Sequence, residues 1–516
     1  MTETVAVHIP KVFYIFAGIA VFYFLYNARR AFAARIGRPT EKPLRIWAIV
    51  RNAVYYGIAQ RKVTSRQFGY AAVMHFCLGW GFIELFFATT VDFLVERGLF
   101  VEFLPHKDTT WFAVLNEIGG LLLIVGIILA LVRRHTRIKP VPLPQNSLDG
   151  RGNLFGDTGI LIILLLLGVG GFLSEAARLV MERPPTAEAS FIAYPLTFLV
   201  SAETWRAWQP WLWWTHAGLA LVLIAVFPQT KLFHTLIGIA NVALTRIPAR
   251  GELRPMNIAA LMESPDLDAE GLVLGAEKVE DFTWKQLLDA EACTECARCT
   301  SVCPAFNTDK PLSPMKIIQD LRRTLYGQTI LGRASAGLIG ECIAPLELWS
   351  CTTCRACMEV CPVFIDHIPT IIDMRRFLVL SEGQPPQDAT GPLEKTGQQG
   401  NPWGFPRSNR IKWATDAGLD VPLMADKQTA DVLYWVGCAG AYDPRNQEVS
   451  KAMVTIFQAA GADYAVLGEE ENCTGDSARR MGEEYLYETL AQQNMATLAK
   501  YRFNRIITAC PHCFQT

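Results

Sequence analysis

Cysteine carries the clearest chemical signal in this sequence of 516 residues. Thirteen of the fourteen cysteines follow residue 290, and eight of them fall in CTECARCTSVCP (293–304) and CTTCRACMEVCP (351–362). Both runs read C-x2-C-x2-C-x3-C-P, a spacing in which three thiols of one run and the last thiol of the other surround a cubane. We therefore predict two [4Fe–4S] clusters, with the ligand sets Cys293, Cys296, Cys299 and Cys361, and Cys351, Cys354, Cys357 and Cys303. Two structural zinc sites are the alternative, but they do not require the doubled spacing.

The last four cysteines follow segments that read as buried strands. Cys438 ends DVLYWVG, Cys473 follows DYAVLG, and Cys510 and Cys513 follow RIITA. Ligands of parallel α/β sheets gather beyond the carboxyl ends of the strands, so we expect these four thiols to converge. A third iron–sulfur cluster is the favoured occupant, and a zinc ion or a redox disulfide remain alternatives. Cys342 lies outside every motif and reads as a core cysteine.

The elements that must position these residues divide into an apolar first half and a polar second half. Hydrophobic residues make up 51% of the chain and concentrate before residue 245. Five segments there are long enough to cross about 30 Å of hydrocarbon, and they lie at about 10–30, 68–95, 111–132, 158–181 and 211–245. The first of them lacks a basic leader and a cleavage site, so it reads as a retained span. The net charge of −1 gives no footprint for nucleic acid.

Basic residues predict how the spans are oriented. Lysine and arginine crowd the loops that follow the first, third and fifth spans, and the other two loops have almost none. The positive-inside rule then places the amino terminus outside and everything after residue 245 in the cytoplasm of a prokaryote, with the chain a multi-pass protein of the inner membrane. A reducing compartment favours metal clusters over disulfides for the thiols.

Histidines within the spans are candidate ligands for haem. His216 and His234 are 18 residues apart, so in one continuous helix they would face the same side, about 27 Å apart. His75 lies in the second span. Imidazole suits haem iron, and ionisable groups in lipid often mark function. A hydrogen bond to a neighbouring helix is the alternative for each single histidine.

The fifth span resembles a known haem-binding family. Its pattern H-x11-P-x2-K-L-x-H is similar to the last span of the respiratory nitrate reductase gamma subunit, and the resemblance covers about residues 1–245. That family has five spans and carries haem b ligands on its second and fifth helices. It has two histidines ten residues apart on the second helix, where this sequence has His75 and Leu85. Because His75 and His234 both fall in the inner halves of their spans, we predict them as the ligands of one haem b.

The outer half of the membrane part leaves two interpretations open. His216 could bind a second haem with an unusual partner such as His106, or it could line a quinone site. Glu84, in the second span, is a candidate for proton transfer at that site. His135 follows the third span beside two arginines and reads as a solvated residue.

The polar half divides into a cluster module and an α/β domain. We expect a membrane domain at 1–250, a connector at 251–285, an α-helical two-[4Fe–4S] ferredoxin-type domain at 286–382, a Pro/Gly-rich linker at 383–428 and an α/β domain at 429–516. The last domain resembles the CCG cysteine-rich domain of heterodisulfide reductase subunits, with Asn472 where that family has an additional cysteine. Such domains occur in tandem, so the resemblance implies an incomplete first copy and a missing second one.

The order of the parts resembles one group of membrane iron–sulfur proteins, the electron-transfer-flavoprotein:quinone oxidoreductases linked to bacterial β-oxidation. EENCTGDSARRMGEEYLY and GNPWG contribute to the resemblance. It implies an enzyme that takes electrons from reduced electron-transfer flavoprotein and passes them through iron–sulfur clusters and haem b to menaquinone. No G-x-G-x-x-G fingerprint is present, so a flavin donor would be a separate protein. A heterodisulfide reductase-like enzyme, a subunit that serves a lactate or glycolate dehydrogenase, and a non-catalytic relay or anchor subunit are the alternatives.

Overall fold

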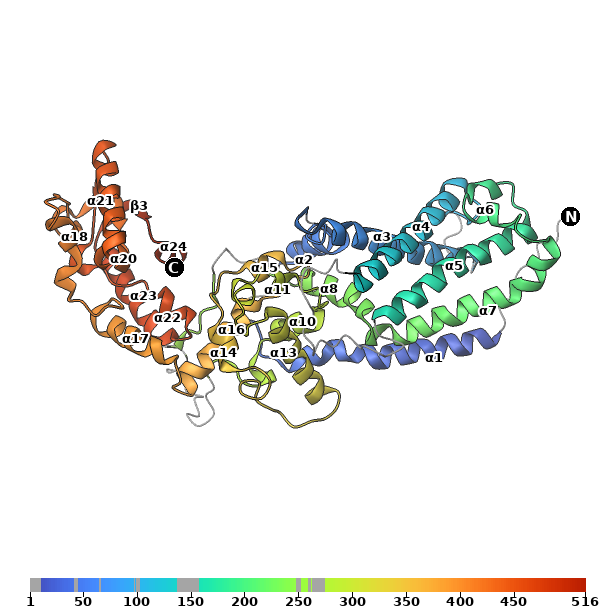
Figure 1. The fold of residues 1–516 in the computed structure, drawn as a ribbon, viewed down its shortest axis with the longest axis horizontal. Coiled ribbons are helices and arrows are strands. Elements are labelled where there is room, and N and C mark those ends of the chain that lie inside the picture. Colours follow the sequence, from blue (N-terminus) through green and yellow to red (C-terminus); the bar gives the residue numbers. More distant parts are fainter. Residues whose placement is uncertain are drawn as a thin grey trace.

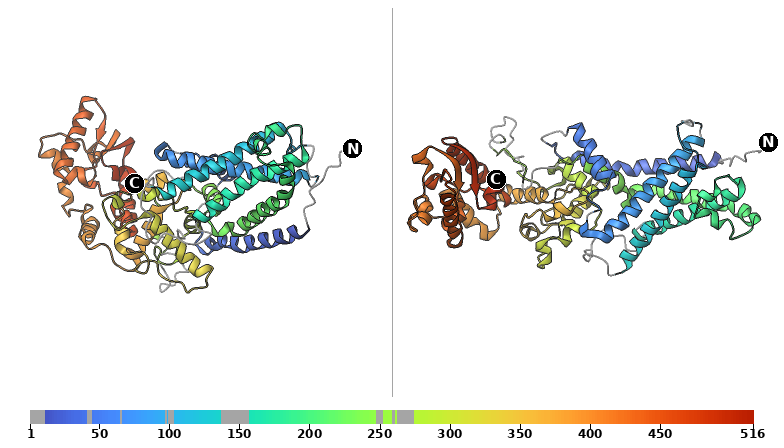
Figure 2. Two further views of the ribbon diagram at one scale, coloured as in Figure 1. Left: turned by 45° about the vertical axis from the view of Figure 1, so that its right-hand side comes forward. Right: turned by 90° about the horizontal axis from the view of Figure 1, so that it is seen from above.

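The chain forms an elongated molecule in three parts. The computed structural model describes residues 11–40, 45–64, 66–96, 98, 103–136, 157–246, 252–258, 261 and 274–516. A bundle of long helices occupies one end, a compact helical module lies in the middle, and an α/β part forms the other end (Figure 1). Figure 2 shows the same order from two other sides. Residues 251, 259, 260 and 262–273 of the connector expected at 251–285 lie outside the described residues.

The first part is a bundle of long apolar helices. Within the described residues, five helices are long and apolar enough to cross a membrane. They are α1 (Lys11–Ala28), α3 (Gly69–Glu96), α4 (Thr110–His135), α5 (Asp157–Glu182) and α7 (Ala202–Val226). At most 33% of each apolar window is buried, so the apolar side chains face outward, as they do in lipid.

Glycines let two of these helices approach closely. A Cβ at Gly81 of α3 would lie 2.5 Å from the backbone nitrogen of Leu123 on α4. A Cβ at Gly126 of α4 would lie 2.5 Å from the backbone nitrogen of Leu78 on α3. Small residues at such crossings are typical of helices packed within a membrane.

The fifth span is not one helix. After α7 ends at Val226, the chain forms two 3-10 turns, η5 (Phe227–Gln229) and η6 (Lys231–Phe233), before α8 (His234–Ala243) begins. Thr230 between the turns is extended, with φ −106° and ψ 169°. The expectation that His216 and His234 share one side of a continuous helix is therefore wrong. Pro228 has no N–H for a helical hydrogen bond, which favours a break at this point. After the break, Oγ1 of Thr230 accepts the N–H of Leu232 in the second turn.

Short elements line the end of the bundle that faces the middle part. The basic loop after α1 forms α2 (Ile46–Asn52) and a π-helical turn, η2 (Ala53–Ile58), and both contact α8. At the opposite end, α6 (Ala193–Leu196) packs against α5. Asn52, which is buried, donates its side-chain N–H to the carbonyl of Thr245 at 2.9 Å and so fixes α2 to the segment after α8.

The middle part contains short helices around one hydrophobic core. Its helices are α10 (Trp284–Ala292), α11 (Arg298–Ser301), α12 (Pro304–Asn307), α13 (Pro314–Thr329), α14 (Pro345–Trp349), α15 (Ala356–Val360) and α16 (His367–Arg376). Phe233 and Ile237 at the start of α8 belong to the same core as Leu287 and Ile318. The end of the bundle and the middle part are therefore packed together as one body.

The third part is α/β. Its sheet is parallel, as expected from the strand patterns, and the strand order is β2-β1-β3. The strands and longer helices are β1 (Thr429–Trp435), α20 (Gly437–Tyr442), α21 (Pro444–Ala459), β2 (Tyr464–Ala465), α22 (Asp476–Arg480), α23 (Glu484–Leu498), β3 (Arg502–Thr508) and α24 (Pro511–Gln515). The Pro/Gly-rich segment expected as a linker is folded, with α17 (Gln387–Gln399), α18 (Lys412–Thr415) and α19 (Met424–Lys427).

Candidate iron–sulfur and haem sites

The eight thiols of the two motifs gather in two groups. Cys293, Cys296, Cys299 and Cys361 line one small pocket, which we call the first thiol site. Cys357 lies close enough to three other thiols to interact with them electrostatically, and we call this set the second thiol site: Cys351, Cys354, Cys357 and Cys303. Each site combines three thiols of one motif with the last thiol of the other.

The backbone of both motifs is shaped to wrap around a bound group. Glu295 and Ala297 in the first loop have left-handed conformations, with φ of 53° and 61°. Thr353 and Arg355, at the equivalent positions of the second loop, have φ of 54° and 65°. Consecutive turns of this kind direct backbone N–H groups to the inside of the loop, where they suit an anionic cluster. The N–H of Thr353 donates to Sγ of Cys351 at 3.4 Å.

The thiols fit cubanes better than single metal ions. Within the described residues, no three His, Cys, Asp or Glu side chains converge closely enough to hold one metal ion. A cubane keeps its four ligand sulfurs farther apart than one zinc ion does, because the ligands bind separate iron atoms. Burial raises the pKa of Cys293 to about 11 and that of Cys361 to about 12, so their thiolates need a positive partner. Iron supplies that charge when a cluster binds.

The four thiols of the third part also converge. The side chains of Cys438 and Cys473 share a hydrogen bond, and so do those of Cys510 and Cys513. Cys513 is also near enough to Cys438 for an electrostatic interaction. Gly437 has φ of 76°, and a Cβ there would lie 3.1 Å from Sγ of Cys513. A side chain at this position would therefore crowd the thiols. No disulfide links any of the fourteen cysteines.

The folded segment before β1 covers this thiol site. The carbonyl of Gly400 accepts the N–H of Cys473 at 2.9 Å and the thiol of Cys438 at 3.6 Å. The buried guanidinium of Arg410 donates to Glu471 at 2.7 Å and to Sγ of Cys438 at 3.6 Å. Asn472 is buried beside Gly400, and its Oδ1 has no hydrogen-bond partner within the described part of the chain.

His75 and His234 come together where α3 meets α8. Their ring centres lie 6.1 Å apart, with the rings edge to face at 69°. Two metal–imidazole bonds of about 2 Å, plus the distance from each nitrogen to its ring centre, add up to about 6 Å. At this spacing His75 and His234 would be able to hold one haem iron between them, and such a group would supply one-electron chemistry there.

Both imidazoles are held by hydrogen bonds through Nδ1. Nδ1–H of His75 donates to Oε1 of Gln60 at 3.2 Å, and Nδ1–H of His234 donates to the carbonyl of Lys231. Each bond leaves Nε2 as the free ligand atom and sets the tautomer. Gly79, one turn after His75, makes room for Gln60, because a Cβ there would lie 2.7 Å from Nε2 of Gln60.

The other membrane candidates lie apart from this pair. His216 on α7 packs against Gly170 and Gly171 of α5, and its Nδ1 has no hydrogen-bond partner in the described residues. Glu84 fills a notch on α4, where a Cβ at Gly119 would overlap its Oε2. His106 accepts the N–H of Asp108 at 3.3 Å. Within the described residues, neither Glu84 nor His106 contacts His216.

One large cavity connects the histidines with the first thiol site. It has a volume of about 2860 Å³ and runs inside the bundle past His75, His216 and His234. Sites for small ligands occupy about 300–1,000 Å³, so this cavity has room for a haem and a further ligand. Residues 294–298 and 362–363, from the two motifs, line the same cavity. The first thiol site is therefore the one beside the bundle.

The second thiol site is joined to the third part by arginines. Arg480 of α22 donates to Oγ1 of Thr353 at 3.1 Å, within the loop that carries Cys351 and Cys354. Its Nε also donates to Asp476, whose carboxylate accepts Nδ1–H of His512 at 2.6 Å. His512 lies between Cys510 and Cys513. A continuous chain of hydrogen bonds thus runs from one thiol site to the next.

Comparison with known proteins places these sites in a family. Residues 289–365 match the family model of the 4Fe-4S dicluster domain, and residues 432–516 match that of the cysteine-rich CCG domain. The chain is 30% identical to "EtfAB:quinone oxidoreductase" of Syntrophomonas wolfei, over 91% of the chain and 71% of that protein. It is 31% identical to "Probable iron-sulfur-binding oxidoreductase FadF" of Bacillus subtilis, over 97% of the chain and 75% of that protein. The chain belongs to the family of these two iron–sulfur oxidoreductases.

A third relative matches more than half of the chain. The chain is 40% identical to "Probable membrane-anchored ferredoxin" of Chromohalobacter salexigens, over 58% of the chain and 47% of that protein. No solved structure matches the chain. The family and the five apolar helices make the chain a membrane-bound iron–sulfur oxidoreductase that transfers electrons. The predicted layout of a helix bundle, a two-cluster domain and a CCG domain is confirmed.

Sequence reasoning missed several residues that hold these sites. Gln60 lies in a loop, and nothing in the sequence around it indicates a contact with His75. Arg410 is likewise one of several basic residues in a polar segment, with Arg407 and Lys412 beside it. The two arginine pairs, Arg375–Arg376 and Arg479–Arg480, are visible in the sequence, but only their burial at the junction of two parts gives them meaning.

Proposed function

We propose that the chain carries electrons from reduced electron-transfer flavoprotein to menaquinone. The order of the sites along the molecule supports this function best. The CCG thiols lie beside the second thiol site, the first thiol site lies beside the membrane bundle, and the histidine pair lies in the cavity next to it. Such an order suits the passage of electrons between a soluble partner and a ligand within the membrane.

We also propose that His75 and His234 hold one b-type haem. A haem supplies one-electron chemistry between the clusters and a two-electron acceptor. The chain's own contribution is to fix both rings through Gln60 and the carbonyl of Lys231. The two [4Fe–4S] clusters would occupy the first and second thiol sites, and a third cluster would occupy the CCG site.

The quinone site is proposed for the part of the cavity lined by His216. Nδ1 of His216 is buried without a partner among the described residues, and a quinone carbonyl could accept a hydrogen bond from it. Glu84 remains the proposed proton donor for this site, although no contact within the described residues joins it to His216, because its buried carboxyl also makes no hydrogen bond there. The basic loops support an orientation with the iron–sulfur parts in the cytoplasm, where a soluble flavoprotein could dock.

A second candidate is disulfide reduction at the CCG site. The pairing of Cys438 with Cys473 and of Cys510 with Cys513 favours it, because adjacent thiols can exchange with a substrate disulfide. The same sites would carry the electrons, but in the opposite direction: a reduced quinone in the membrane would supply the two electrons, and the disulfide would take up these electrons and two protons to give two thiols. A relay subunit without its own substrate is the third candidate.

Anaerobic stopped-flow spectroscopy on the purified protein tests the proposal. The protein is mixed with reduced electron-transfer flavoprotein, the haem b absorption is followed, and a menaquinone analogue is then added. Fast haem reduction followed by reoxidation supports the wire and its donor. A haem that stays oxidised with this donor, but is reduced by a dithiol, contradicts the flavoprotein and favours disulfide chemistry.

Two histidine variants provide the control. His234→Ala should abolish the haem band, whereas His135→Ala, at an exposed position at the end of α4, should leave it unchanged. Equal haem content in both variants would remove His234 from the haem site.

A further inference from the structure

Helix α8 reaches from the histidine pair to the first thiol site. His234 begins the helix, and Asn241 lies seven residues later. Seven residues are about two turns, so the two side chains lie on the same side of the helix. Gly238, between them, packs against Val363, because a Cβ added at Gly238 would lie 3.3 Å from Cγ1 of Val363. The helix therefore touches the loop that follows the ligand Cys361.

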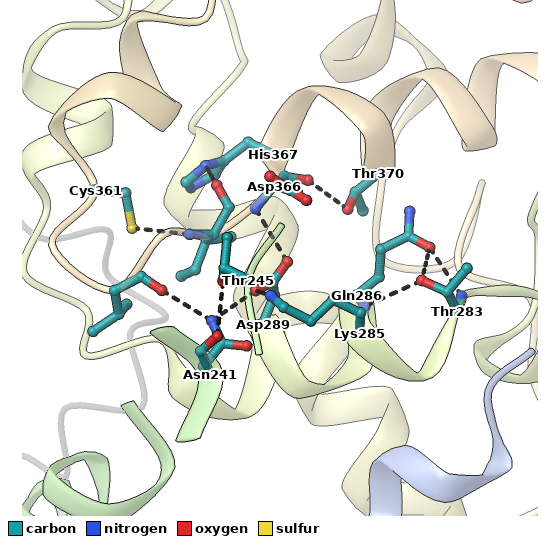
Figure 3. Close-up of polar contacts among 12 residues, drawn as sticks. Asn241, Thr245, Thr283, Lys285, Gln286, Asp289, Cys361, Asp366, His367 and Thr370 are labelled. Carbon is teal, nitrogen blue, oxygen red and sulfur yellow. Dashed lines mark hydrogen bonds and ion pairs between the residues drawn. The ribbon is translucent and has the colours of Figure 1, made fainter. Parts of the chain in front are cut away.

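The side chain of Asn241 makes two bonds across this junction. Its Nδ2 donates to Oδ1 of Asp289 at 2.7 Å and to the carbonyl of Val363 at 2.9 Å. Figure 3 shows Asn241 and Asp289 pointing toward one another, with Lys285 beside them. Asn241 and Asp289 are both 0% exposed, so water does not compete for these bonds.

Asp289 extends the junction to both cluster motifs. It lies on α10, four residues before the ligand Cys293, and its Oδ1 accepts Nζ–H of Lys285 at 2.5 Å. Its Oδ2 accepts the backbone N–H of Asp366 at 3.1 Å (Figure 3). In the same loop, the N–H of Ile365 donates to Sγ of Cys361 at 3.4 Å. Three chain segments, each carrying a proposed ligand, thus meet at one carboxylate.

We infer that Asn241 is a positioning residue that fixes the gap between the first thiol site and the histidine pair by binding α8 to Asp289 and Val363. The inference rests on the proposed function, because it assumes a haem at His75 and His234. Electron transfer slows steeply as the gap between its partners widens, and a site held to within about 0.5 Å depends on the residues that support it. The hydrogen bonds of Asn241 within the described residues go to Asp289, Val363 and Thr245 and not to a proposed ligand, so it acts through His234 and the motif loops.

The test uses the full chain with its cofactors and the variants Asn241→Leu and Asn241→Ser. Leucine keeps the approximate size of asparagine and removes the amide, whereas serine removes both bonds without adding apolar bulk. Asn52→Ala is the matched control, because Asn52 is also buried and also holds the end of α8, through Thr245, but makes no bond to the cluster loops within the described residues.

Two measurements separate positioning from folding. Photoexcited deazaflavin, a small reductant, injects electrons at the iron–sulfur clusters, where Cys354 is exposed, and the rise of the reduced haem band is followed. Hydrogen–deuterium exchange of residues 234–243 reports how firmly α8 is held. Haem content, the electron paramagnetic resonance of the reduced clusters and the melting temperature are measured for each variant.

The expected result is that both Asn241 variants keep haem and clusters but pass electrons to haem about tenfold or more slowly, with faster exchange in α8. Asn52→Ala should match the wild type in the rate. A wild-type rate in Asn241→Ser, with haem and clusters present, overturns the positioning role and leaves the proposed function standing. A wild-type protein that lacks haem overturns both. If Asn241→Leu does not fold, Asn241→Ser decides the question.

Discussion

The imidazole rings of His75 and His234 lie edge to face with their centres 6.1 Å apart, although they come from helices that are distant in sequence. Each ring is fixed through Nδ1, one by the side chain of Gln60 and the other by the carbonyl of Lys231. The arrangement orients both Nε2 atoms before any metal binds. It is the feature of the membrane part that most clearly suits a haem.

Gln60→Leu should weaken haem binding without removing a ligand. The variant removes the acceptor of Nδ1–H of His75 and so frees the ring and its tautomer. Loss of such a supporting hydrogen bond typically costs about 10–100-fold in metal affinity. Titration of the apoprotein with haem, followed by a redox titration of the haem band, measures the effect.

A glutamine at the same end of the bundle provides the control for Gln60. Gln229→Leu removes bonds to Tyr23 and Asn27 of α1 but does not touch either histidine. It should bind haem as the wild type does. Unchanged affinity in Gln60→Leu would show that the histidine needs no support from this residue.

Cys361→Ser should remove the cluster of the first motif rather than the cluster of its own motif. Cys361 lines the first thiol site together with Cys293, Cys296 and Cys299. The variant should therefore lose up to about four irons per chain, together with the signal of one cubane. Iron analysis and electron paramagnetic resonance measure the loss. Combining it with Cys293→Ser should cause no further loss of iron, whereas an additive loss would contradict the crossed ligand sets; Cys342→Ser is the control.

Arg480→Leu should slow the passage of electrons from the CCG site to the second thiol site. The variant breaks the bonds to Thr353 and Asp476, and a hydrogen bond to a charged group contributes about 1.5–3 kcal/mol. Looser docking should increase hydrogen exchange in residues 476–480 and slow cubane reduction by the soluble donor. Arg505→Leu is the matched control, because Arg505 pairs with Asp431 at the surface of the same part. Equal rates in both variants would exclude Arg480 from this junction.

Asp366→Asn should flatten the dependence of stability on pH in the mildly acidic range. Burial, followed by the neighbouring Asp289, raises the pKa of Asp366 to about 6, although Lys285, Arg254 and Arg355 act in the opposite direction. The ordinary pKa of an aspartate is about 3.9, so the folded chain binds this proton more tightly than the unfolded chain does. The contribution of Asp366 to stability is therefore highest below about pH 4, falls as the pH rises to about 6, and is constant above that.

The melting temperature measured between pH 4.5 and 6.5 checks this prediction. Asp366→Asn should change less over this range than the wild type, because its amide does not titrate. Asp416→Asn, at an exposed position, should follow the wild type. A variant at position 366 with an unchanged pH profile would contradict the raised pKa.

The sequence is most informative where spacing and chemistry coincide. The C-x2-C-x2-C-x3-C-P motifs predict cubanes because short loops constrain their thiols locally, and the two-cluster domain is confirmed by its family. The apolar runs predict the first four long helices of the bundle within a few residues, because length and hydropathy are sufficient to identify a span, but they misplace the fifth. The parallel sheet of the CCG domain follows from the alternation of buried strands and helices.

The break in the fifth span shows where local reasoning fails. Pro228 by itself indicates a kink, but the extended Thr230 and the new helix at His234 depend on packing against η2 and α10. That packing turns His234 toward His75 and carries Asn241 to Asp289. No periodicity within residues 202–245 contains this information.

The sequence by itself determined which residues can bind metal and which segments can enter a membrane, because both depend on residue type and on spacing along the chain. Tertiary structure decided which site lies beside which: the first thiol site beside the histidines, and the second beside the CCG thiols. These neighbours are set by polar residues such as the buried Asn241 and the half-buried Arg480, whose partners come from distant segments. A hydrogen bond across such a distance leaves no pattern in the sequence, since it depends on how the completed elements pack.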